Sequence, residues 1–287
     1  MSIAATDLPG RPVHVRDPDS KRRTQLSAID ISRAYFNSST EGPEPTYVAL
    51  PLEHPGHDKG LSGLLLKHMY GTRAAAGGWQ QEYSSLLKSI GLVQGVASPC
   101  IFVQTEKNIS TSVHGDDFTS VGAKCDLDSL EKLMEAKYEL RKGGRLGPGK
   151  DDAKEILVLN RVIRYTDHGL ECEADPRQAE RLLEGLKLDG GCNPVATPGL
   201  EPLIDQLTED KTLPASELTG FRGLAARANY LAADRIDLQY SAKEVCRFMS
   251  APSETSVAAM KRMGRYLSGH QRLVLTYPWQ RAEGIDV

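Results

Sequence analysis

Hydrophobic and polar positions follow two different periods along this chain, and the change divides it into two parts. Before residue 174 short alternating or wholly apolar runs recur, which are typical of strands. Beyond residue 174 apolar positions recur every three or four residues, as in amphipathic helices. We therefore predict an α+β part followed by a helical part. The predicted strands lie at 25–32, 46–52, 98–104, 109–114 and 118–123.

Helices interrupt the strands at two places in the first part. The segment 78–91 carries an apolar stripe and ends on Gly91, a residue typical of the position after a helix. The segment 125–140 has a second stripe, with Asp126 as its expected N-cap. We take YELRKG as the end of that helix and GRLGPGKDD, which nearly spells a phosphate-binding loop, as a flexible charged loop.

The second part opens after a predicted hairpin. That hairpin covers 155–174 and turns around Asp167–Gly169. The next helix has Asp175 as N-cap and proline in its first turn, a common arrangement at helix starts. From 215 to about 270 the pattern is helical with one break, and Ser253 is the expected cap of the last helix.

Composition is that of an ordinary soluble protein. The chain has 287 residues, 40% hydrophobic and 25% charged, with a formal net charge of -3. No apolar run is long enough to span a membrane, and the N-terminus lacks the pattern of a signal peptide. The five cysteines form no C-x-x-C pair, so we expect reduced thiols and no structural zinc. These features favour a cytoplasmic or nuclear location.

Paired acids stand out in the stretch VHGDDF. Gly115 and Asp116 fit the centre of a two-residue type II′ hairpin loop, which places Asp116 and Asp117 at its tip. An acidic turn by itself is more often a solvated turn than a site. Asp30, however, ends a predicted buried strand, where a carboxylate is costly unless it is paired or bound to a cation. Carboxylates from separate strands could together hold Mg²⁺ for phosphoryl transfer.

An ordered series of stretches resembles the reverse transcriptases of copia-type retrotransposons, which are parts of Pol polyproteins. The resemblance covers about residues 26–280, and any one motif is weak while the series is specific. The stretches that carry it are DISRAYF, HMYGTRAAAGGW, SPCIFV, VHGDDFTSVG, LVLNRVIRY, YLAADRIDL and RYLSG.

The resemblance implies an RNA-directed and DNA-directed DNA polymerase, a nucleotidyltransferase that acts on an RNA template, a DNA primer and dNTPs. Its implied fold is a reverse-transcriptase palm, an antiparallel sheet with helices, with partial fingers. These would occupy residues 1–174, with a helical thumb at 175–270. Residues 271–287 would begin the link to an RNase H domain. That domain and the integrase are expected to be absent from this chain, and the location would be particle-associated in the cytoplasm, or nuclear.

The same resemblance assigns roles to residues. Asp30, Asp116 and Asp117 would be the catalytic carboxylates that hold two Mg²⁺ ions, or Mn²⁺, with the Ile31 carbonyl as a further oxygen ligand. The nucleotide-binding residues would be Tyr35, Phe36, Gly71 and Arg73, with Tyr35 beneath the sugar, where its ring would collide with a 2′-OH. Core aromatics and a solvated cation are the alternative interpretations of Tyr35, Phe36 and Arg73.

Some positions depart from the family pattern. The family has Tyr-Val where this chain has His114-Gly115, and Gln-Ala-Pro where it has 74–76. Two alternative functions therefore stay open: a non-catalytic relic of such an enzyme with weak nucleic-acid binding, and a metal-dependent nuclease on an unrelated α+β fold.

Overall fold

A computed structural model describes residues 24–40, 45–199 and 210–279. The polar, proline-containing residues 1–24 predict a loop, and all of them except Thr24 lie outside the described range. The chain divides into two compact units. The first comprises Met1–Leu159, Tyr165–His168 and Trp279–Val287, and the second comprises Asn160–Arg164 and Gly169–Pro278. The expected α+β class is confirmed, since antiparallel sheets and helices both occur. No helix in the described part is long and apolar enough to cross a membrane.

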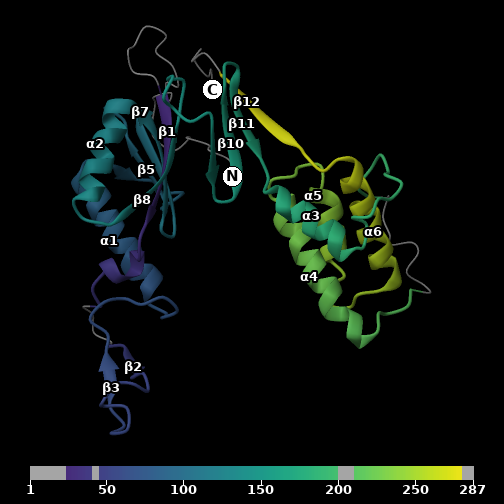
Figure 1. Ribbon diagram of the computed structural model, residues 1–287, viewed down its shortest axis with the longest axis horizontal. Helices are drawn as coiled ribbons and strands as arrows, with labels where there is room; N and C mark the ends of the chain where they lie inside the picture. The colour runs from purple at the N-terminus through teal and green to yellow at the C-terminus, as the bar shows by residue number, and fades with distance from the viewer. Residues whose placement is uncertain (1–23, 41–44, 200–209, 280–287) are drawn as a thin grey trace. The chain divides into compact units, whose positions relative to one another are not determined.

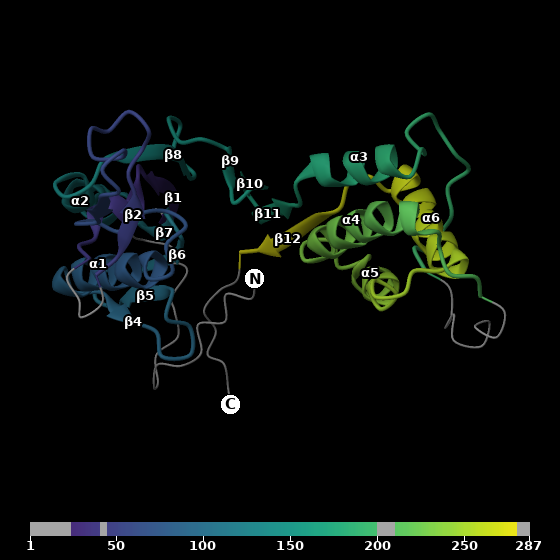
Figure 2. The ribbon, with the colours of Figure 1, turned by 90° about the horizontal axis from the view of Figure 1, so that it is seen from below.

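The first unit contains a six-stranded sheet with the order β4-β5-β6-β7-β1-β8, in which neighbouring strands pair antiparallel (Figures 1 and 2). Two further strands form a small hairpin in the same unit, and β9 also belongs to it. The strands of the large sheet are β1 Thr24–Ile31, β4 Val93–Gln94, β5 Ile101–Gln104, β6 Ile109–His114, β7 Asp117–Ala123 and β8 Leu140–Leu146. The others are β2 Tyr47–Ala49, β3 Ser62–Leu64 and β9 Glu155–Val158.

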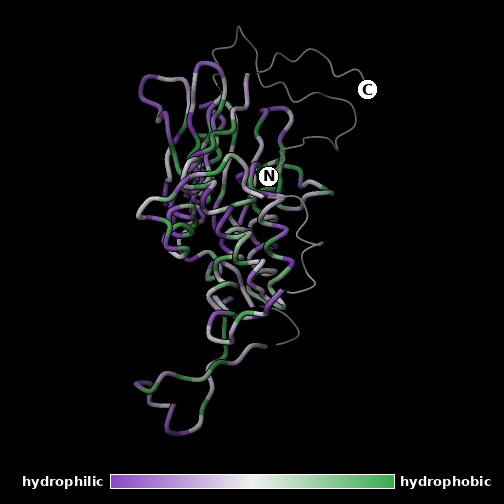
Figure 3. Tube along the Cα trace, turned by 90° about the vertical axis from the view of Figure 1, so that its right-hand side faces the viewer, coloured by the Kyte–Doolittle hydropathy of each residue, from purple (hydrophilic) through white to green (hydrophobic). Residues whose placement is uncertain are grey.

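Helices α1 (Ala75–Ser89) and α2 (Lys124–Glu135) cover one face of this sheet (Figures 1 and 2). The alternation of side chains along β1 produces this packing of helices on the sheet. Every second residue of β1 is buried, and the intervening ones are half-exposed. Hydrophilic and hydrophobic positions are accordingly interleaved along the trace (Figure 3). The buried positions join both helices in one core that includes Ile29, Ile31, Trp79, Phe118, Leu130 and Met134.

The helix ends agree only in part with the sequence prediction. Gly91 follows the C-cap of α1 with a φ of 90°, as expected of a glycine in that place. The prediction for α2 is wrong at both ends. The helix has Ala123 as its N-cap, and Asp126 lies in the first turn, where its charge favours the helix dipole instead.

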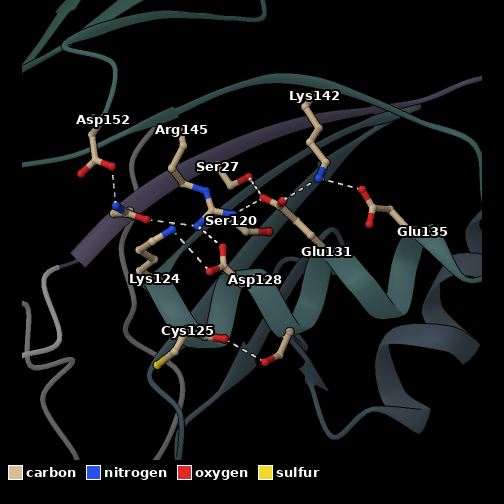
Figure 4. Close-up of polar contacts among 12 residues, drawn as sticks. Ser27, Ser120, Lys124, Cys125, Asp128, Glu131, Glu135, Lys142, Arg145 and Asp152 are labelled. Carbon is tan, nitrogen blue, oxygen red and sulfur yellow. Dashed lines mark hydrogen bonds and ion pairs between the residues drawn. The ribbon is translucent and has the colours of Figure 1, made fainter. Parts of the chain in front are cut away.

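Strand β8 is the larger error, because YELRKG is not the end of a helix and the first part of GRLGPGKDD is not a loop. Residues 140–146 pair with β1, although two glycines and three cations obscure the strand pattern. Two of these cations, Lys142 and Arg145, reach acids on α2 (Figure 4). Lys142 Nζ lies 2.7 Å from a carboxylate oxygen of Glu135, and Arg145 forms an ion pair and hydrogen bond with Glu131.

Glu131 is the centre of this charge network. The Ser27 hydroxyl on β1 donates to its Oε1 at 2.6 Å, so β1, β8 and α2 meet at one carboxylate (Figure 4). Burial acts to raise the pKa of Glu131, but the hydrogen bonds from Ser27 and Arg145 outweigh it and the pKa is lowered. The ionised carboxylate therefore ties the edge strand to the rest of the unit.

The second unit is mainly helical, as predicted, and contains α3 Pro176–Gly185, α4 Ala215–Ala232, α5 Gln239–Cys246 and α6 Glu254–Gly269. Two predicted caps are confirmed. The Asp175 side chain accepts from the Arg177 backbone N–H with Pro176 in the first turn, and Ser253 forms a capping box with Ser256. Small and apolar residues from all four helices pack together, including Leu182, Phe221, Ala225, Leu238, Ala242 and Met263.

Arg235 fixes the connection between α4 and α5. Its side chain is almost completely buried and donates two hydrogen bonds to Asp237, at 2.9 and 2.7 Å. It also donates to the carbonyls of His270 and Gln271 just after α6. A buried guanidinium needs such partners for its five donors, so this clamp is structural.

Strands β10 (Arg161–Thr166) and β11 (Gly169–Glu173) form a hairpin at the predicted turn, but the predicted range 155–174 also contains β9 as a separate strand beside β10. Strand β12 (Val274–Pro278) pairs antiparallel with β11. β12 lies within the residues predicted to begin a link. Glu173 is 4% exposed and accepts from Arg272 at 2.8 Å and from Arg164 at 2.7 Å. Hydrogen bonds from Arg272, followed by those from Arg164, lower the pKa of Glu173 to about 2 against the opposing effect of burial.

The Glu173 cluster makes the stability of the second unit depend on pH. A depressed carboxylate pKa stabilises the fold above pH 4.5, and this contribution is lost as the pH falls toward 2. We expect Glu173→Gln to lower the free energy of unfolding by about 2 kcal/mol at pH 7, discounted because Arg272 is largely exposed. The difference from wild type should shrink steadily below pH 4.5.

Urea unfolding followed by circular dichroism at several pH values would measure this effect, with the exposed Glu180→Gln on α3 as the matched control. A constant difference between Glu173→Gln and wild type across that pH range would contradict the assignment.

Candidate active site

A two-residue turn joins β6 to β7 and carries the paired acids. His114 and Asp117 are opposite each other in the register, which leaves Gly115 and Asp116 as the loop. Gly115 has a φ of 65°, in the region that favours glycine. The predicted hairpin loop with glycine first is therefore confirmed. A side chain at residue 115 would strain this backbone, so glycine suits the turn.

Asp30 lies directly opposite Asp117, because β1 pairs with β7 in that register. Side chains of directly opposed residues project from the same face of a sheet, with Cβ atoms about 5 Å apart. The Ile31 backbone N–H also donates to the Asp116 carbonyl at 2.9 Å, which anchors the turn to the end of β1. Acids 86 and 87 positions apart in the chain are thus brought to one end of the sheet.

Both acids lie on the sheet face away from α1 and α2. The neighbours Ile29, Ile31 and Phe118 point into the helical core, whereas Asp30 and Asp117 are half-buried on the other face. The same alternation that builds the core therefore leaves these carboxylates accessible to a ligand.

Asp117 shows the electrostatic cost of this arrangement. Its pKa is raised, first by burial and then by the charges of Asp116 and Asp30, while His114 partly opposes the shift. Repulsion among neighbouring carboxylates is relieved by a cation, and oxygen ligands suit Mg²⁺. Among the residues described by the structure, no three His, Cys, Asp or Glu side chains form a ready-made metal cluster. The charge and the oxygen ligands at this turn fit a divalent cation. The three Asp side chains do not converge into a complete coordination site.

The other predicted residues lie on two short segments. Tyr35 and Phe36 belong to the 3-10 helix η1 (Ala34–Asn37), which follows β1 after a single turn. Gly71 has a φ of 85° in the turn before α1, and Arg73 is exposed near the start of that helix. Nothing in the described contacts joins Arg73 to the acids.

Trp79 belongs to the apolar stripe of α1 and also contacts the acidic turn. Its ring is 1% exposed, and its indole N–H donates to the Gly115 carbonyl at 2.8 Å. This hydrogen bond therefore connects the acidic turn to α1. The tryptophan of the HMYGTRAAAGGW stretch was the available signal, because a buried indole N–H needs an acceptor.

Arg141 was also missed, because it was assigned to the end of a helix. In the register of β8 it lies opposite Asp30, on the side of β1 away from β7. Opposed residues share a face, so an exposed cation stands beside the first carboxylate.

Comparison with known proteins points to transposable elements. The chain is 27% identical over 259 residues to the retrovirus-related Pol polyproteins from transposons RE1 and RE2 of Arabidopsis thaliana. The matched region is 86% of this chain but 16% of each relative, so the chain spans about a sixth of their length. No protein-family model matches it. The similarity supports an origin in a retrotransposon Pol polyprotein.

The charge coupling at the turn can be measured directly. We expect Asp116→Asn to move the titration of the Asp117 carboxyl to lower pH, because removal of a neighbouring negative charge favours the ionised form. Asp30→Asn should cause a smaller shift in the same direction. Carboxyl carbon chemical shifts followed by NMR from pH 2 to 7 would report it, and an unchanged Asp117 titration in Asp116→Asn would contradict the coupling.

The bond from Trp79 makes a second prediction. Trp79→Phe removes the indole donor and leaves the Gly115 carbonyl without that partner. The free energy of unfolding should therefore fall by about 1–3 kcal/mol. Hydrogen exchange should accelerate in the peptide that contains residues 114–117. Exchange within α2 is the internal control. Equal acceleration in both segments would indicate a general loss of packing and not a released turn.

Proposed function

We propose that this chain is the polymerase part of a copia-type reverse transcriptase. The observation that carries the proposal is the opposed pair Asp30 and Asp117, next to a tight turn that bears Asp116. Similarity to two transposon Pol polyproteins supports it. The reaction is attack of a primer 3′-OH on the α-phosphate of a dNTP, which forms a phosphodiester bond and releases pyrophosphate.

Asp30, Asp116, Asp117 and the Ile31 carbonyl would hold two Mg²⁺ ions, or Mn²⁺ in their place. When bound, these ions would stabilise the charge that develops on the phosphoryl oxygens. Burial and the charges of Asp116 and Asp30 raise the pKa of Asp117, and bound cations would offset that effect and keep the carboxylate ionised. Trp79 and the Ile31 N–H keep the turn in place during this chemistry.

In this proposal the first unit supplies the palm and part of the fingers, and the helices of the second unit supply the thumb. The RNA template and DNA primer would lie along the sheet face that carries the acids. Tyr35, Phe36, Gly71 and Arg73 would bind the incoming nucleotide, with the Tyr35 ring beneath its sugar. The protein would act in the cytoplasm within particles, or in the nucleus.

A non-catalytic relic is the second candidate. It is favoured by the lack of a ready-made three-ligand metal cluster in the described part of the chain, and by the departures at 74–76. The retention of three acids on one accessible sheet end favours the enzyme, since a fold alone does not require two further carboxylates whose charges raise the pKa of Asp117.

Primer extension distinguishes these candidates. With an RNA template, a DNA primer, dNTPs and Mg²⁺, the full chain should extend the primer, and Asp116→Asn should reduce the rate by about a hundredfold or more. Asp58→Asn, a change at an exposed acid on the loop between β2 and β3, is the matched control and should extend like wild type.

Equal extension by wild type and Asp116→Asn would contradict the proposal. A folded wild-type protein that binds primed template without extending it would favour the relic, and cleavage of nucleic acid without dNTPs would favour the nuclease.

A further inference from the structure

Tyr70 joins the two segments that carry the predicted nucleotide-binding residues. Its ring centroid lies 4.3 Å from that of Tyr35, with the planes tilted by 56°, and 5.9 Å from that of Phe36 in an edge-on contact. Tyr70 comes from the turn before α1, whereas Tyr35 and Phe36 come from η1. One tyrosine therefore contacts both aromatics of the other segment.

A tight turn presents Tyr70 to η1. The Thr72 N–H and hydroxyl both donate to the Met69 carbonyl, at 3.1 and 2.8 Å, which closes a four-residue turn. Gly71 occupies the third position with a φ of 85°, as a type II turn requires. Gly71 therefore has a backbone reason for being glycine, and the turn holds Tyr70 at its corner.

The aromatic cluster is near the acidic turn, because η1 closely follows β1 and the Ile31 N–H at the end of β1 donates to the Asp116 carbonyl. The pKa of Tyr70 is raised, first by burial and then by the charge of Asp116, while hydrogen bonds with the backbone of Tyr35 and Ala34 partly oppose the shift. The side chain of Tyr70 therefore interacts electrostatically with Asp116 and also contacts the backbone of η1.

Tyr35 is supported on two sides. Its ring packs partly buried against the core beneath the sheet. Its backbone carbonyl accepts from the Ser38 N–H and hydroxyl, at 3.2 and 3.0 Å. Within the described residues, its ring makes an aromatic contact with Tyr70. The core sets one side of the ring, and Tyr70 limits its movement on another.

We infer that Tyr70 is a positioning residue which holds the Tyr35 ring in place and thereby sets the preference for deoxyribonucleotides over ribonucleotides. The inference rests on the proposed function, since it concerns the nucleotide site of that polymerase. A ring excludes a 2′-OH by steric contact only if it does not yield, and a second ring against it resists displacement. Coupling of an aromatic pair corresponds to a change of about twofold to tenfold in this preference.

The test compares dATP with ATP for the full chain with primed RNA template and Mg²⁺. Single-nucleotide incorporation gives kcat/KM for each, and equilibrium binding of the two nucleotides gives a preference that needs no turnover. The variants are Tyr70→Ala, which removes the ring, and Tyr70→Phe, which keeps it. Tyr47→Ala on β2 is the matched control, since Tyr47 is 62% exposed and lies on a different strand.

Tyr70→Ala should lower the preference for dATP by about twofold to tenfold through better use of ATP, whereas Tyr70→Phe and Tyr47→Ala should match wild type. Tyr70→Leu takes the place of Tyr70→Ala if circular dichroism shows that the alanine variant is unfolded. An unchanged preference in the variant without the ring would overturn the inference, as would an equal loss in Tyr70→Phe.

The two proposals fail separately. A binding preference that depends on Tyr70 without any incorporation would defeat the polymerase and leave the inference standing. Incorporation or binding that never distinguishes dATP from ATP in wild type would overturn the inference.

Discussion

The register between β1 and β7 is the constraint on which the rest of the candidate site depends. It sets Asp30 opposite Asp117 and brings the Ile31 N–H to the Asp116 carbonyl. A slip of one residue in either strand would turn the carboxylate into the core and expose its apolar neighbours. Burial of Ile29 and Phe118 therefore fixes the position of the acids as firmly as it fixes the fold.

Charges are distributed between the two faces of this sheet in a way that serves both stability and chemistry. On the helical face Arg145 and Lys142 pair with α2 acids, and the lowered pKa of Glu131 keeps that network ionised. On the opposite face burial, followed by the charges of Asp116 and Asp30, raises the pKa of Asp117. The first face stabilises the fold, and the second gathers three carboxylates at one end of the sheet, which is a common feature of functional sites.

Local signals predicted the elements that local chemistry controls. The caps at Asp175 and Ser253, the glycine after α1 and the tight loop at Gly115 were all recognisable, because each depends on a few adjacent residues. Strand β8 was not, because LRKGGRL has neither apolar alternation nor β-branched residues. Its strand conformation comes from pairing with β1 and from acids supplied by α2, which are distant in sequence.

The sequence by itself determined the α+β class, the order of most elements and the identity of the acidic residues, because periodicity and turn chemistry are written in neighbouring positions. Only the tertiary structure decided that Asp30 faces Asp117, that Trp79 holds the turn and that Tyr70 contacts Tyr35. Each of these pairs is at least 35 positions apart, and strand register and helix packing, which no local pattern specifies, bring them together.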